Sequence, residues 1–245
     1  MASQSASHAA VRYVSALTGM RALAALLVLL LHTNHFIPAN MADALPFLLR
    51  GYLGVDFFFI LSGFIITHVY LASLAHPTWS ATKVFLWHRL VRLYPVHATV
   101  LGSMLAMTSL AAIMGIQVNN PEMLRMGDLY AHLLLIHAWG VISSASWNAP
   151  AWSISAEWFV YLLFPALAPM LMRLSRPWSA LALAAVSLGV MVAVLAAVGL
   201  TLEYSWLGPP ALVRVTGEFI CGAALCRALM LSPGGTRGIG RLLPR

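Results

Sequence analysis

Charged residues are scarce in this chain of 245 residues. Aspartate, glutamate, lysine and arginine make up 9% of the sequence, whereas a soluble globular domain carries about 25%. Hydrophobic residues make up 61%. A chain this apolar cannot cover its surface with polar groups, which excludes a soluble enzyme, and its hydrophobicity also excludes intrinsic disorder.

Cysteine and acidic residues are scarce as well. The two cysteines, Cys221 and Cys226, stand five residues apart in one apolar stretch, which indicates neither a disulfide framework nor a C-x-x-C redox motif. Seven acidic residues against 14 basic ones give a net charge of +7. Nucleic-acid binding is not expected, because no basic run is interleaved with aromatic residues. The basic residues stand instead at the ends of apolar segments, where membrane topology explains them.

Long apolar stretches are what the sequence has in abundance. A spanning helix needs about 20 such residues, and the stretches predict an all-α fold, a polytopic transmembrane helical bundle with six to seven membrane segments. No internal repeat is visible, so residues 1–245 are predicted to form a single membrane domain. The stretches are 22–38, 54–75, 93–116, 129–142, 152–172, 178–200 and 209–231.

The fourth stretch, 129–142, is short and contains His132 and His137. If it does not span and the tail at 1–16 is cytoplasmic, most lysines and arginines lie on the cytoplasmic side, as the positive-inside rule requires. If it spans, every later segment is inverted and the bias is lost. Six spans with both ends inside are therefore preferred, and the fourth stretch must then be buried in protein or line a water-filled cavity.

Polar side chains are expensive inside a membrane, so each one is a candidate functional residue. His32 follows Arg21 by eleven residues, about 16 Å along a helix, which puts Arg21 at the cytoplasmic interface and His32 in the outer half of the bilayer. A neutral imidazole is a general base near pH 7. The alternatives are a histidine hydrogen-bonded to another helix and an interfacial histidine at a helix end. A signal peptide over 1–42 is disfavoured, because His32 interrupts its apolar core.

Glu157 lies near the start of the apolar stretch 152–172, at the same predicted depth as His32. A carboxylate beside an imidazole fixes its tautomer and raises its basicity, as in a hydrolase triad. The alternative is that Glu157 interacts with the dipole at the start of its helix. His32 and Glu157 are therefore the two candidate catalytic residues.

Arg89 and Arg92 stand three residues apart, just before the helix predicted over 93–116. This spacing places both guanidinium groups on one face, where they can grip a phosphorylated ligand. The alternative is positive charge beside anionic lipid.

Several further residues are substrate-binding or structural candidates. Ser62, together with the glycines of 51–63, predicts a helix that neighbours approach closely, and Asp56 is a cap or part of a site. Arg214 and Glu218, at i,i+4 on the last helix, predict a structural pair or a cavity lining. No metal site is expected, because the histidines share no face with acidic or cysteine partners at ligand spacing.

Taken in order, these motifs resemble the membrane acyltransferase family 3, whose members acylate bacterial surface polysaccharides, Nod factors, peptidoglycan and small molecules. Each motif is weak by itself, but the order and the apolar background make the resemblance specific from residue 15 to about residue 230. The motifs are the segment 17–24 running to His32, then 51–67, Arg89 to Pro95, Trp152 to Pro165, and Arg214 to Gly222.

The resemblance implies roles for individual residues. His32 corresponds to the essential histidine and Arg21 to its companion, Arg89 and Arg92 to the cytoplasmic pair implicated in acyl-CoA use, and Glu157 to the conserved glutamate of its motif. Within that motif, Trp152, Ser155 and Tyr161 join the substrate-binding or structural candidates. No cofactor is expected to be bound permanently. Acyl-CoA, usually acetyl-CoA, is the implied co-substrate.

The predicted function is an integral membrane O-acyltransferase in the bacterial inner membrane. It would move an acyl group from cytoplasmic acyl-CoA to a hydroxyl of a glycan or small molecule at the outer face, with membrane lipid as its other partner. His32 would act as base or as acyl carrier. The family has about ten helices, so the chain is expected to lack the carboxy-terminal ones, and an inactive truncated remnant is one alternative. The other is a transporter or flippase, which the arginine pair and the missing inverted repeat disfavour.

Overall fold

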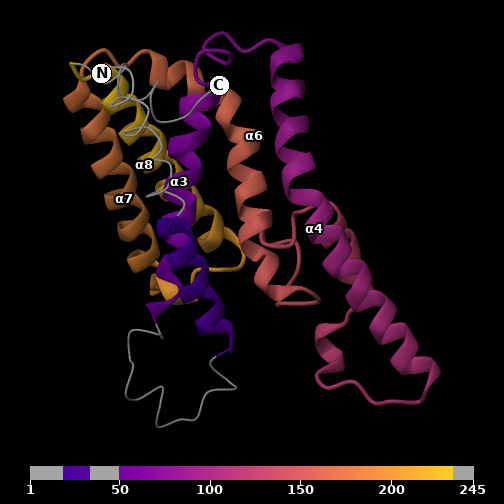
Figure 1. Ribbon diagram of the computed structural model, residues 1–245. Helices are drawn as coiled ribbons and strands as arrows, with labels where there is room; N and C mark the ends of the chain where they lie inside the picture. Colours follow the sequence, from indigo (N-terminus) through magenta and orange to yellow (C-terminus); the bar gives the residue numbers. More distant parts are fainter. Residues whose placement is uncertain (1–18, 34–49, 234–245) are drawn as a thin grey trace, which may run out of the picture. The chain divides into compact units, whose positions relative to one another are not determined.

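The computed structural model describes residues 19–33 and 50–233 (Figure 1). These residues form seven α-helices, several short 3-10 turns and no β-strand, which confirms the all-α prediction. The predicted cytoplasmic tail at 1–16 lies outside them. The helices are Gly19–Thr33, α3 (Leu53–Tyr70), α4 (Trp79–Ile113), α5 (Leu129–Leu133), α6 (Trp152–Met172), α7 (Pro177–Ala197) and α8 (Pro209–Leu231).

Four of these helices, α3, α4, α6 and α7, are long and apolar enough to cross a membrane. Large apolar side chains lie exposed on them, such as Met107 and Ile113 on α4 and Val186 on α7. Lipid tails can cover such surfaces, so the chain is an integral membrane protein. The helix Gly19–Thr33 is shorter and α8 carries three charged residues, so the total of six spans stays a prediction.

The stretch 129–142 forms no spanning helix, as preferred from the charge bias. Helix α5 is five residues long, far short of the roughly 20 that a span needs. Leu135 ends it in the left-handed region, at φ 57°. The amides of Leu135 and Ile136 bond back to the carbonyls of His132 (3.1 Å) and Ala131 (2.8 Å), the pattern of a Schellman cap.

After this cap the chain continues without regular structure until Asn148. Polar side chains hold its outer part. Arg125 donates to Asp128 Oδ2 (2.7 Å) and to the carbonyl of Ser144 (2.9 Å), while Trp147 Nε1 donates to the carbonyl of Arg125 (2.8 Å). These bonds satisfy backbone carbonyls that no helix or sheet pairs, as a non-helical segment at a membrane requires.

Helix α4 corrects one prediction, because it begins at Trp79 and not at residue 93. Arg89 and Arg92 therefore lie inside a helix and not just before one. Their charges interrupt the apolar pattern, which is why hydropathy misplaced the helix start. With 35 residues, α4 is about 52 Å long and exceeds a hydrocarbon core of about 30 Å. It bends part-way along (Figure 1) and contains Pro95, a cause of such bends.

The chain forms two compact units, and helices α6, α7 and α8 contribute residues to both. The first unit comprises 1–71, 170–189 and 217–245, and the second comprises 72–169 and 190–216. The prediction of a single membrane domain is neither confirmed nor contradicted by this division.

Small residues bring the helices of the first unit into close contact. A Cβ atom at Gly51 or Gly54 would meet backbone of the helix Gly19–Thr33. A Cβ at Gly63 of α3 would collide with the carbonyl oxygen of Phe219 on α8, and one at Gly222 of α8 would collide with the carbonyl of Ile60. The glycines at 51–63 therefore serve helix packing, as the sequence predicts.

Replacing Gly63 by alanine tests this packing. Gly63→Ala should lower the free energy of unfolding by about 1–3 kcal/mol, because a backbone carbonyl on α8 cannot yield as a flexible side chain can. Gly102→Ala on α4 is the matched control, since no atom lies within 4 Å of its added Cβ, and it should be neutral or slightly stabilising. Unfolding in a mild detergent measures both, and equal stability of the two variants would contradict the close contact.

Candidate active site

His32 lies near the end of the helix Gly19–Thr33, in the first unit. Its Nδ1 is 2.8 Å from the carbonyl oxygen of Val28, one turn back. A carbonyl only accepts, so Nδ1 carries the proton and Nε2 of the neutral ring carries the lone pair. The side chain is exposed. Its Nε2 can therefore act as a base or a nucleophile. Arg21 begins the same helix about 16 Å away.

Three other candidates share the first unit with His32. Asp56 is buried in the first turn of α3, where its charge suits the helix dipole. Ser62 is half-buried further along the same helix. Glu218 on α8 is 2% exposed. Buried carboxyl groups are rare in an apolar environment. Asp56 and Glu218 therefore stay candidates for a substrate-binding or structural role.

Glu157 and Tyr161 meet in the second unit. They stand one turn apart on α6, and the Tyr161 hydroxyl donates to Glu157 Oε1 over 2.5 Å, the length of a charge-assisted bond. Tyr161 is buried, with its ring edge-on to Phe85 at 6.3 Å. A rigidly packed phenol thus fixes the orientation of a half-buried carboxylate, which the i,i+4 spacing alone could have suggested.

Arg214 on α8 is the bulkiest of the fully buried side chains in the described part of the chain, at 1% exposed. Its Nη1 donates to the carbonyl of Leu202 over 2.9 Å, and its guanidinium lies 5.3 Å from the ring centre of Trp152. The carbonyl and the cation–π contact both compensate for burial of the charge. Arg214 and Trp152 therefore lie together, whereas pairing of Arg214 with Glu218 stays a prediction.

Ser155 has a structural role, one of its two predicted alternatives. Its hydroxyl donates to the carbonyl of Leu135 (2.8 Å) and accepts from the amide of Ala138 (3.1 Å), and the side chain is fully buried. Trp139 Nε1 donates to the Ser155 carbonyl over 2.9 Å. These bonds fasten the irregular segment after α5 to the first turns of α6.

Arg89 is half-buried and Arg92 is exposed, both on α4 in the second unit. Their three-residue spacing on a continuous helix places them on one face. Glu157 belongs to the same unit and His32 to the other. The approach of Glu157 to His32 therefore stays a prediction.

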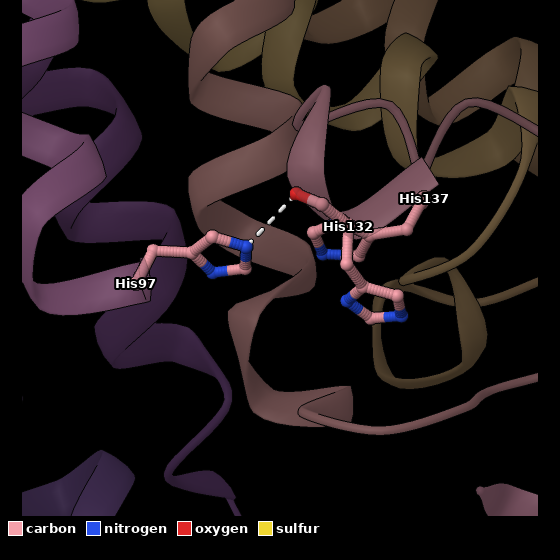
Figure 2. A group of neighbouring side chains, drawn as sticks. All are labelled: His97, His132 and His137. Carbon is pink, nitrogen blue, oxygen red and sulfur yellow. Dashed lines mark hydrogen bonds between the residues drawn. The ribbon is translucent and has the colours of Figure 1, made fainter. Parts of the chain in front are cut away.

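Sequence reasoning missed one cluster, formed by His97 of α4, His132 of α5 and His137 of the irregular segment (Figure 2). All three are buried, and the His132 and His137 rings stack with centroids 4.1 Å apart. His97 Nε2 donates to the carbonyl of His132 over 2.9 Å. Burial lowers the pKa of His132 to about 4 and that of His137 to about 3. Both rings are therefore neutral near pH 7.

No periodicity in the sequence could reveal this cluster. His97 lies 35 residues before His132, and the five-residue step from His132 to His137 fits neither a helix face nor a strand face. Only the Schellman cap at Leu135, which turns the chain back, places the two rings side by side.

Comparison with known proteins shows the family to which the chain belongs. The model of the acyltransferase domain, acyltransferase 3, matches residues 14–237. The chain belongs to this acyltransferase family. The match includes His32, the arginine pair of α4, Glu157 and Arg214, so the resemblance read from the motifs is confirmed.

Several bacterial proteins are similar to the chain. Protein 2 in picA locus of Rhizobium radiobacter is 32% identical over 46% of the chain and 54% of its own length. The peptidoglycan O-acetyltransferase OatA of Listeria monocytogenes is 29% identical over 63% of the chain and 24% of its own length. The O-acetyltransferase OatA of Staphylococcus aureus is 28% identical over 75% of the chain and 30% of its own length. The chain thus spans about half or less of these relatives. No solved structure matches it.

Removing the Ser155 hydroxyl tests its role as a fastener. Ser155→Ala leaves the Leu135 carbonyl and the Ala138 amide unpaired, so the free energy of unfolding should fall by about 1–3 kcal/mol. Hydrogen exchange at the Ala138 amide should accelerate. Ser153→Ala, two residues earlier on α6, is the matched control and should change neither. Unaltered exchange at Ala138 in Ser155→Ala would remove the structural assignment.

Proposed function

We propose that this chain is the membrane core of an O-acyltransferase that takes an acyl group from cytoplasmic acyl-CoA and places it on a hydroxyl at the outer face of the bacterial inner membrane. The observation that carries the proposal is His32, whose Nδ1–H donates to the Val28 carbonyl and so leaves Nε2 available, in a chain that belongs to the acyltransferase 3 family. The acyl group is acetyl, in keeping with the names of the O-acetyltransferase relatives.

The reaction follows from the chemistry of Nε2. As the acceptor oxygen attacks the thioester carbonyl, Nε2 takes the hydroxyl proton. The C–S bond breaks, the CoA thiolate leaves, and the imidazolium returns the proton to it, so the products are the acyl ester and CoA. In the second version Nε2 attacks the thioester carbonyl, the C–S bond breaks and the CoA thiolate leaves. The acceptor hydroxyl then attacks the acyl-imidazole, the N–acyl bond breaks, and the hydroxyl proton ends on the CoA sulfur. Trapping an acylated His32 in the absence of acceptor distinguishes the two versions.

Arg89 and Arg92 bind the donor. Two guanidinium groups on one face of α4 match the phosphates of CoA, and planar guanidinium forks bind phosphate in bidentate fashion. Helix α4 is longer than the hydrocarbon core, so the pair can lie at the aqueous interface, where CoA is available. Arg21, at the predicted cytoplasmic end of the His32 helix, is a further candidate for donor binding.

Glu157 is the second catalytic residue of the proposal. The Tyr161 hydroxyl holds its carboxylate in one orientation over 2.5 Å. The acceptor substrate is a glycan hydroxyl, an expectation supported by the peptidoglycan O-acetyltransferase of Listeria monocytogenes, which is 29% identical. Small molecules are the alternative acceptors.

Replacing His32 tests the proposed chemistry. His32→Ala should lower CoA release from acetyl-CoA by about 10²–10⁴-fold, the usual contribution of a general base. The chain is assayed in lipid nanodiscs with a panel of glycan acceptors. His76→Ala, an exposed histidine outside the site, is the matched control and should keep native activity.

The outcomes separate the mechanism from the activity. Native CoA release that persists in His32→Ala would overturn the role of His32. A folded native chain that releases no CoA with any acceptor would overturn the acyltransferase activity and favour a transporter or an inactive remnant.

Replacing the arginine pair tests donor binding. Arg89→Ala with Arg92→Ala should raise KM for acetyl-CoA by at least about 100-fold, since two charge-assisted bonds of about 1.5 kcal/mol or more are lost. The KM for the acceptor should not change. Lys83→Ala is the control, because this lysine precedes the pair on α4 and stacks over Trp79 at 4.9 Å. An equal rise in both variants would indicate general surface charge and not a binding pair.

A further inference from the structure

The proposed acyl transfer assigns no role to the histidine cluster. It joins α4, α5 and the irregular segment after α5, all within the second unit. One ring nitrogen of each histidine lies within 4.8 Å of those of the other two. In Figure 2 the Nε2 edge of His97 faces the stacked rings of His132 and His137.

Several ring nitrogens of the cluster are buried without a hydrogen-bonding partner. They are Nδ1 of His97, Nδ1 of His132 and both nitrogens of His137. Buried polar atoms are nearly always paired, and a group of them in one place points to a water or an ion. Imidazoles that are neutral, such as those of His132 and His137, are the form that binds metal.

We propose that His97, His132 and His137 form a binding site for a divalent transition-metal ion of the zinc type. The proposal is independent of the acyltransferase function, because none of the three histidines is assigned to donor or acceptor binding. Three imidazoles leave one tetrahedral position for water, as in other three-histidine sites. The ion would fasten the irregular segment to α4.

The hydrogen bonds around the cluster suit this role. His132 Nε2 lies 3.2 Å from the Ser146 hydroxyl, so Nε2 can donate there and present Nδ1 to a metal, the usual outer-shell arrangement of a ligating histidine. His97 must release the His132 carbonyl to bind through Nε2. That carbonyl still accepts from the Leu135 amide at 3.1 Å and stays paired.

Binding requires a defined movement of the rings. Nitrogens that share a tetrahedral zinc lie about 3.3 Å apart, as bonds of about 2.0–2.1 Å require, so the donor atoms must draw together. A metal lies in the plane of each ligating ring, whereas the His132 and His137 planes are 11° from parallel. His137 has to turn about its side-chain bonds, away from the backbone of Ala131 and Ala151 that lies beside its ring.

The donor set selects the metal. Imidazole nitrogen suits zinc, cobalt, nickel and copper, whereas magnesium and calcium require oxygen ligands. The negative charge of Asp128 acts on His132 electrostatically, and Asp128 forms an ion pair with Arg125 at 2.7 Å. It favours a cation in the cluster without displacing an imidazole from it.

Titration of the whole chain with metal tests the site. The protein is purified in nanodiscs through an affinity tag that contains no histidine, stripped with a chelator, and titrated with Co²⁺, whose visible spectrum reports tetrahedral nitrogen coordination. We expect one equivalent to bind and Zn²⁺ to displace it. His97→Ala, His132→Ala and His137→Ala should each weaken binding by at least about 100-fold, since loss of a mere outer-shell partner weakens it 10–100-fold.

The matched control is His76→Ala, an exposed histidine of the same unit, which should bind cobalt as the native chain does. A folded native chain that binds no stoichiometric cobalt or zinc would overturn the site. Binding that survives all three cluster substitutions, or that falls equally in His76→Ala, would overturn it too.

A measurement on the native chain covers the case in which the cluster variants fail to fold. X-ray absorption of the zinc-loaded protein should show three imidazole ligands at about 2.0–2.1 Å. Fewer than three imidazoles, or a shell of oxygen alone, would overturn the proposal.

Discussion

A polar group inside a bilayer has no water to bond, so it must find its partner within the protein. This constraint explains how the polar residues of the spanning helices are arranged. Glu157 accepts from the buried hydroxyl of Tyr161, and Arg214 lies against Trp152 and the Leu202 carbonyl. Each polar group is held in one orientation as a result. A catalytic or binding residue also needs a fixed orientation. The need for a partner inside the protein therefore makes such polar residues rare and also holds them in the orientation that function requires.

The irregular segment from α5 to Asn148 depends on the same constraint. Its backbone has no helix or sheet to pair with, so side chains supply bonds: Ser155 from α6, His97 from α4 and Arg125 from the turn before α5, while Trp147 within the segment donates to the Arg125 carbonyl. Helix α5 ends at a Schellman cap, which needs one residue in the left-handed backbone conformation. Leu135 adopts that conformation at a cost in conformational free energy. The contacts that hold this segment in place also position His132 and His137, so the histidine cluster depends on them.

Membership in the acyltransferase 3 family relates these local arrangements to one proposed reaction, the transfer of an acyl group. The hydrogen bond from His32 Nδ1 to Val28 prepares one nitrogen for chemistry, while the arginines of α4 lie on a helix longer than the membrane core. The proposed reaction, with its donor in the cytoplasm and its acceptor outside, requires functional groups at both faces of the membrane. The small residues that pack α3 against α8 give the first unit the rigidity to hold its helix in place.

The sequence by itself determined the helical membrane fold, favoured a stretch at 129–142 that does not span, and named His32, Glu157 and the arginine pair as candidates. These features follow from hydropathy, charge bias and spacing, which are properties of neighbouring residues. The start of α4, the structural use of Ser155 and the meeting of His97 with His132 and His137 depend on contacts between distant segments. The transfer free energy of a helix is nearly a sum over its own residues. The partner of a buried polar atom, by contrast, is decided only when helices pack and loops turn back, so only the tertiary structure could reveal it.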